Sequence, residues 1–128
     1  MCSLQLCTAT PPRSLLITTA ILEQQIQKQI LDYLRYRGIF CWKNNTAGIF
    51  VRSRNTYIPS HAPGVADILG ILKDGRFLAI EVKAAKGKVA PHQQAFLNEI
   101  AARGGVAFVA RSIEDVQQKL NGNIGSNN

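Results

Sequence analysis

The segment VADILGILKDGRFLAIEVK, residues 65–83, constrains the fold of this chain more than any other feature. Two apolar runs flank the tripeptide K-D-G at 73–75, a pattern that predicts an antiparallel hairpin. Both runs carry charges where apolar packing would favour Val or Leu. Asp67 lies on the first, and Glu81 and Lys83 lie on the second. Any fold for this chain must therefore explain an acid on one strand and an acid and a base on its neighbour.

The register of the hairpin decides whether these charges meet. If residues 74–75 form a two-residue turn, Asp67 faces Val82 and the two carboxylates point to opposite sides of the sheet. If residues 73–75 form a three-residue loop, Asp67 faces Glu81, and Lys83 lies on the same side. The sequence favours the longer loop, because its glycine stands where a positive φ is needed. A shift of one residue separates the two outcomes.

The rest of the chain predicts helices packed on a mixed sheet. Residues 22–38 have a helical period whose apolar stripe contains Leu22, Ile26, Ile30, Tyr33 and Leu34. The other expected elements are strands at 39–42 and 48–59, a helix at 91–104, a buried parallel strand at 106–110 and a helix at 112–120. We therefore expect an α/β sandwich with a central mixed β-sheet flanked by helices.

The length of 128 residues indicates one domain. We expect this domain at residues 20–120, after a flexible N-terminal extension at 1–19 and before a disordered tail at 121–128. Three cysteines without a C-x-x-C pair indicate neither a disulfide framework nor a zinc ribbon. This cysteine usage fits a reducing setting best, so we expect an intracellular, cytoplasmic protein. No apolar run reaches the roughly 20 residues that a membrane span needs.

The net charge of +7 favours a polyanionic partner, with nucleic acid as the leading class and an anionic membrane surface as the lesser one. Several basic side chains could hold phosphates, among them Arg54, Lys43 and Arg111. We expect this role for Arg52, Lys86 and Lys88, which lie on loops or strand ends near the charged hairpin. The segment AAKGKVAP after Lys83 reads as a flexible basic loop.

The charged hairpin itself has two interpretations. Asp67 or Glu81 could form a cross-strand salt bridge with Lys83 on an exposed hairpin. Alternatively, the two carboxylates could bind a hard cation such as Mg²⁺, which takes carboxylate oxygens, water and substrate phosphate. A lysine beside that ion could orient or deprotonate a water molecule that attacks phosphorus.

Two further polar residues are predicted to face the protein interior. Gln93 shares a helix face with Phe96, Leu97 and Ile100. Glu23 lies within about 40° of the centre of the apolar stripe of the first helix. An inward amide can simply satisfy a buried backbone group, so Gln93 alone does not define a site.

The ordered set of Glu23, GVAD, EVK and Gln93 resembles the VRR-NUC branch of the PD-(D/E)XK nuclease superfamily. The resemblance runs from about residue 21 to residue 120 and includes PHQQAFLNEI and RGGVAFVARS. The chain has Ala66 where the superfamily name implies proline, a departure that is common in this branch. Residues 1–19 have no counterpart in the pattern.

The resemblance implies a restriction-endonuclease-like fold and a Mg²⁺-dependent deoxyribonuclease, in which Mn²⁺ can substitute. It implies that Asp67, Glu81 and the carbonyl of Val82 are metal ligands and that Lys83 is the catalytic lysine. Gln93 would be a positioning residue, and Glu23 an acid near the metal. Homodimers that act on branched, Holliday-junction-like DNA in replication, repair or phage DNA processing are implied as well. The alternative is a non-catalytic DNA-binding or assembly module on the same fold.

Overall fold

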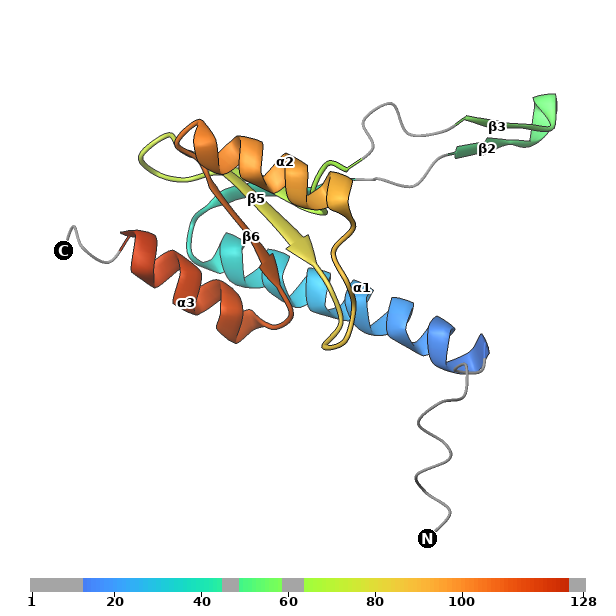
Figure 1. Cartoon of the computed structure of the whole chain (residues 1–128), viewed down its shortest axis with the longest axis horizontal. Coiled ribbons are helices and arrows are strands. Elements are labelled where there is room, and N and C mark those ends of the chain that lie inside the picture. Colours follow the sequence, from blue (N-terminus) through green and yellow to red (C-terminus); the bar gives the residue numbers. More distant parts are fainter. Residues whose placement is uncertain (1–12, 45–48, 59–63, 125–128) are drawn as a thin grey trace, which may run out of the picture.

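A computed structural model of the chain describes residues 13–44, 49–58 and 64–124. Its main body has three layers, with α1 (Arg13–Tyr36) and α3 (Ile113–Ile124) on one face of a sheet and α2 (Pro91–Ala102) on the other (Figure 1). These three layers confirm the predicted α/β sandwich. None of the helices in the described residues combines the length and hydropathy of a membrane span.

The sheet has four strands in the order β1-β4-β5-β6. These are β1 (Phe40–Lys43), β4 (Ile68–Ile71), β5 (Phe77–Val82) and β6 (Val106–Ala110). β1 and β5 each pair antiparallel with β4, whereas β6 pairs parallel with β5. β5 is therefore a central strand with a partner on both sides, and the prediction of a mixed sheet with a buried parallel strand is confirmed.

The connection between β4 and β5 is the three-residue loop. The Leu72 N–H donates to the Arg76 carbonyl at 2.9 Å, and the Gly75 N–H donates to the Leu72 carbonyl at 2.9 Å. Gly75 has a φ of 90°, which is the left-handed conformation that this loop requires of its last residue. The resulting ladder pairs Ile68 with Ile80, so the next pair outward is Asp67 and Glu81.

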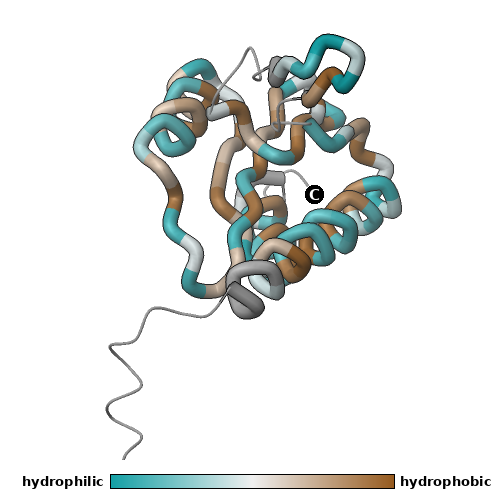
Figure 2. The backbone as a smooth tube through the Cα atoms, turned by 90° about the vertical axis from the view of Figure 1, so that its right-hand side faces the viewer, coloured by the Kyte–Doolittle hydropathy of each residue, from teal (hydrophilic) through white to brown (hydrophobic). Residues whose placement is uncertain are grey.

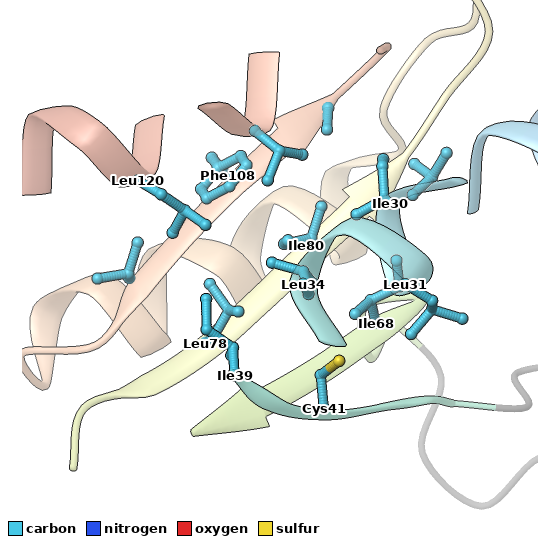
Figure 3. Packing of buried hydrophobic residues seen from close by; sticks show 14 of the residues in the cluster. Ile30, Leu31, Leu34, Ile39, Cys41, Ile68, Leu78, Ile80, Phe108 and Leu120 are labelled. Carbon is cyan, nitrogen blue, oxygen red and sulfur yellow. The ribbon is translucent and has the colours of Figure 1, made fainter. Parts of the chain in front are cut away.

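Two apolar clusters hold the layers together. The larger one joins α1 and α3 to the sheet, and Figure 3 shows Ile30 and Leu34 of α1 lying beside Ile80 of β5. The smaller one lies under α2 and is built around Ala79 and Leu97. Along the helices, the backbone tube in Figure 2 changes between hydrophilic and hydrophobic within each turn, as expected of helices that pack one face on a sheet.

Both terminal helices are longer than the sequence predicts. α1 begins at Arg13 rather than near Leu22, so residues 13–19 are helical and do not form a loose extension. Leu22 was expected in the core, but it is 46% exposed because this part of α1 extends past the sheet (Figure 1). α3 continues to Ile124, beyond the predicted end at residue 120. The remainder of the predicted extension (1–12) and tail (125–128) lies outside the described residues.

The predicted strand at 48–59 is instead a separate hairpin. β2 (Ile49–Val51) and β3 (Thr56–Ile58) pair antiparallel around a short 3₁₀ turn, Arg52–Arg54. Asn55 closes that turn with a φ of 46°, a left-handed conformation that Asn tolerates better than most residues. The hairpin is set apart from the four-stranded sheet (Figure 1).

Candidate active site

The charged side chains gather where β5 ends. Asp67 lies immediately before β4, directly opposite Glu81 in the register of the hairpin. The Val82 N–H donates to Asp67 Oδ2 at 3.0 Å and so fixes the aspartate against β5. The Asp67 carbonyl in turn accepts a bond of 2.7 Å from the Asn44 N–H, which ties this corner to the end of β1.

Glu81 is the most deeply buried acid of this group, with only 2% of its surface exposed. Burial raises its pKa from 4.5 to about 7, and the negative charge of Asp67 adds to the rise. Lys83 opposes the rise but does not cancel it. The protein therefore holds a carboxyl group in a place where its ionised form needs a positive partner.

Lys83 and Gln93 both contact the same oxygen of Glu81. Lys83 Nζ lies 3.7 Å from Glu81 Oε1, and Gln93 Nε2 donates to this atom at 2.9 Å. Gln93 is thus turned inward from the first turn of α2, as its helical position predicts. An ion pair between Glu81 and Lys83 is also present, but it joins two residues at the end of the same strand rather than residues on facing strands.

The other oxygen of Glu81 contrasts with the first, because no described residue donates a hydrogen bond to it. Glu81 Oε2 is buried and, within the described residues, accepts no hydrogen bond. Asp67 cannot supply one when both acids are ionised, because a carboxylate is only an acceptor. An unpaired buried acceptor is costly, and a proton or a cation shared with Asp67 would remove that cost.

This donor set fits a hard divalent cation. Mg²⁺ is commonly bound by one or two carboxylates and keeps several waters or phosphate oxygens as its other ligands. Within the described residues there is no cluster of three or more His, Cys, Asp and Glu side chains suited to a metal. The pair of Asp67 and Glu81 therefore suits an ion that is shared with water and substrate rather than enclosed by protein.

Glu23 reaches the same end of β5 from α1, but its observed contact is with the backbone. Its Oε1 accepts a hydrogen bond of 3.2 Å from the N–H of Ala84, the residue after Lys83. The predicted inward orientation of Glu23 is confirmed. In this geometry the acid fixes the chain where it leaves β5.

The three predicted phosphate contacts lie in two different places. Lys86 and Lys88 are exposed on the loop between β5 and α2, next to Lys83 in the chain. Arg52 is exposed in the turn of the β2–β3 hairpin, which stands apart from the sheet (Figure 1). Only the two lysines are thus brought to the end of β5.

The sequence does not indicate the contacts of Arg111. Its guanidinium donates to backbone carbonyls of the β5–α2 loop. Gln27 was also missed, and it is buried on α1 with its Oε1 unpaired within the described residues. The helical period could have identified Gln27, because it lies one turn after Glu23 and three residues before Ile30.

The sequence and the fold both match the VRR-NUC family. The family model of the VRR-NUC domain matches residues 21–114. A solved structure described as a VRR_NUC domain has a similar fold, with a TM-score of 0.56 and 25% sequence identity, over 78% of this chain and 95% of that one. No curated protein matches the sequence significantly.

Proposed function

The chain belongs to the VRR-NUC family, and on this premise we propose that it is a metal-dependent endonuclease that hydrolyses phosphodiester bonds in DNA. The observation that carries the proposal is Glu81 Oε2, a buried oxygen that accepts no hydrogen bond from the described residues. The carboxylate to which it belongs lies opposite Asp67. In a salt-bridged hairpin this buried acceptor would stay without a partner at a cost in free energy, whereas a bound cation would satisfy it.

We assign Asp67, Glu81 and the carbonyl of Val82 as ligands of Mg²⁺, for which Mn²⁺ can substitute. A divalent cation bound there would acidify a water molecule and offset the negative charge of the scissile phosphate. Lys83 keeps its ammonium group at this oxygen cluster, with its side chain 16% exposed and thus open to substrate. In this position it can orient the attacking water and stabilise charge that develops on the phosphate. Gln93 fixes the orientation of Glu81.

We propose structured or branched DNA as the substrate and a homodimer as the active form. The edge of the four-stranded sheet at β1 supports the proposal of a dimer, because exposed apolar side chains lie on β1 and on its neighbour β4. The rings of Phe40 and Trp42 lie 5.6 Å apart between centroids with their planes tilted by 60°, and Phe40 pairs with Ile71 across the strands. All three are exposed, and exposed apolar patches of this kind mark association surfaces. Sedimentation of wild type and Trp42→Asp tests the dimer.

We place this activity inside the cell, in replication, repair or phage DNA processing. The described cysteine, Cys41, is a buried free thiol, which is compatible with a reducing compartment.

Cleavage assays test the proposal. The wild-type protein is incubated with duplex, flap and four-way-junction DNA, with and without Mg²⁺, beside Asp67→Ala and Lys83→Ala. We expect metal-dependent cutting of at least one branched substrate and its loss in both variants. If wild type cuts none of the DNAs but binds them in a salt-sensitive way that Asp67→Ala leaves unchanged, the protein is a non-catalytic DNA-binding module.

A further inference from the structure

The loop between β5 and α2, residues 83–90, is fastened to the body of the protein at several points. The Lys83 N–H donates to the Ala110 carbonyl at 3.1 Å, and the Ala84 N–H donates to Glu23. At the other end of the loop, the Ala90 N–H donates to Gln93 Oε1 at 3.0 Å. The sequence suggests a flexible basic loop, but its backbone is anchored at both ends.

Arg111 is the residue that fastens the middle of this loop. Its Nη1 lies 2.6 Å from the Ala84 carbonyl oxygen, 2.7 Å from that of Gly87 and 3.3 Å from that of Ala85. An Nη group carries two protons, so the two short contacts are full hydrogen bonds and the third is a shared one. Bonds from a charged donor are about twice as strong as neutral ones.

The position of Arg111 is itself fixed. It follows the last residue of β6, and its N–H donates to Asp115 Oδ2 at 2.9 Å, at the start of α3. One side chain thus connects the end of β6 to a loop that is 24 to 27 residues away in the chain. The loop also closes on itself, because the Gly87 N–H donates to the Ala84 carbonyl at 2.9 Å.

This arrangement orients the loop for an anionic partner. Three carbonyl groups, which are the negative ends of their peptide dipoles, turn inward to Arg111. The side chains of Lys86 and Lys88 stay exposed on this loop. We propose that Arg111 is a positioning residue, which holds the β5–α2 loop in the conformation that presents Lys86 and Lys88 to the phosphates of bound DNA. The inference rests on the proposed function, because it takes DNA as the partner.

Two measurements test it. In Arg111→Ala we expect hydrogen exchange at the Gly87 amide to accelerate, while the Ile80 amide in the centre of the sheet stays protected. We also expect metal-free affinity for four-way-junction DNA to fall about tenfold, which corresponds to about 1.4 kcal/mol. In a Lys86→Ala/Lys88→Ala background, Arg111→Ala should change the affinity less than twofold, because it acts through those lysines.

Further variants separate positioning from direct contact. Arg111→Lys keeps the charge, but its side chain is one bond shorter and should not reach the carbonyls that Nη1 contacts, so it should behave like Arg111→Ala. Arg103→Ala, which removes an exposed arginine paired with Glu99, is the matched control and should change neither measurement. Removing Lys86 and Lys88 should reduce the slope of log affinity against log salt by about two.

Three results would overturn the inference. Unchanged exchange at Gly87 in Arg111→Ala means that Arg111 does not hold the loop. Suppose that Arg111→Lys keeps the wild-type affinity for DNA, and that the loss of affinity in Arg111→Ala adds to the loss caused by removing Lys86 and Lys88. Arg111 then contacts phosphate itself. If wild type binds no DNA, the proposed function and the DNA part of the inference fail together, but the exchange rates still decide whether Arg111 anchors the loop.

Discussion

Gln93 links Glu81 to the start of α2, because one end of its amide contacts Glu81 and the other end contacts the backbone just before the helix. Its Nε2 donates to Glu81 Oε1 at 2.9 Å, and its Oε1 accepts from the Ala90 N–H at 3.0 Å. The second bond is one half of a capping box, in which the third helical residue satisfies the backbone before the helix. Because each end of the amide has its own partner, the carboxylate is held in one orientation by the start of a helix.

Replacing Gln93 should therefore disturb the site more than the fold. We expect Gln93→Ala to lower kcat/KM for DNA cleavage about 10- to 100-fold, the range seen when a residue that supports a metal ligand is removed. The loss of its hydrogen bonds should lower the free energy of unfolding by only about 1 kcal/mol. Urea unfolding and steady-state cleavage measure the two effects. Gln94→Ala is the control, because Gln94 is exposed and bonded to Asn98, and it should leave cleavage unchanged.

Glu81 should make the stability of the metal-free protein depend on pH. Its pKa is about 7 in the folded state and 4.5 ordinarily, so the folded protein binds this proton more tightly than the unfolded chain does. The stabilisation is complete below about pH 4.5 and is lost as the pH rises to about 7. At about 1.36 kcal/mol per pKa unit, the loss is on the order of 3 kcal/mol. Urea unfolding between pH 4.5 and 8 measures it.

Glu81→Gln is the control for this pH dependence, because it places an uncharged group of the same shape at this position. Its free energy of unfolding should change less between pH 4.5 and 8 than that of wild type. Asp67→Asn should shift this loss of stability to lower pH, since it removes the charge that adds to the rise in the pKa of Glu81. Wild-type and Glu81→Gln curves that run parallel from pH 4.5 to 8 would contradict the prediction.

A divalent cation should stabilise the protein in the absence of DNA. At pH 7.5, addition of Mn²⁺ or Mg²⁺ should raise Tm, because the ion binds the folded site and offsets the repulsion between the two acids. At ten times its Kd the ion adds about 1.4 kcal/mol. Asp67→Asn should lose this response. Thermal unfolding followed by circular dichroism gives the measurement, and an equal shift in wild type and Asp67→Asn would place the ion elsewhere.

The charged hairpin was predictable from sequence because its register depends on local chemistry. Glycine at position 75 favours the three-residue loop, and that loop alone decides that Asp67 lies opposite Glu81. The inward positions of Glu23 and Gln93 follow from helical geometry in the same way. Both are local arguments, so they need no knowledge of how distant segments pack.

The contacts of Arg111 could not be predicted, because they depend on the packing of segments that are distant in the chain. Its three carbonyl partners belong to the loop after β5, which meets Arg111 only because β5 and β6 pair in parallel. Backbone carbonyls also leave no trace in the amino-acid sequence. The length of α1 was missed for another reason, since the helix before Leu22 extends past the sheet and needs no apolar stripe.

Glu23 can be assigned either to the backbone or to the metal, and two substitutions separate these roles. Its Oε1 accepts a hydrogen bond from the Ala84 N–H at 3.2 Å, a contact that an amide oxygen can also make. If Glu23 acts through the loop, Glu23→Gln should keep cleavage within about threefold of wild type, whereas Glu23→Ala should lose about tenfold or more. Cleavage rates at several Mn²⁺ concentrations measure this, with the exposed Asp32→Asn on the same helix as control. Equal losses in Glu23→Gln and Glu23→Ala, with a weaker apparent affinity for Mn²⁺, would instead assign its charge to the metal.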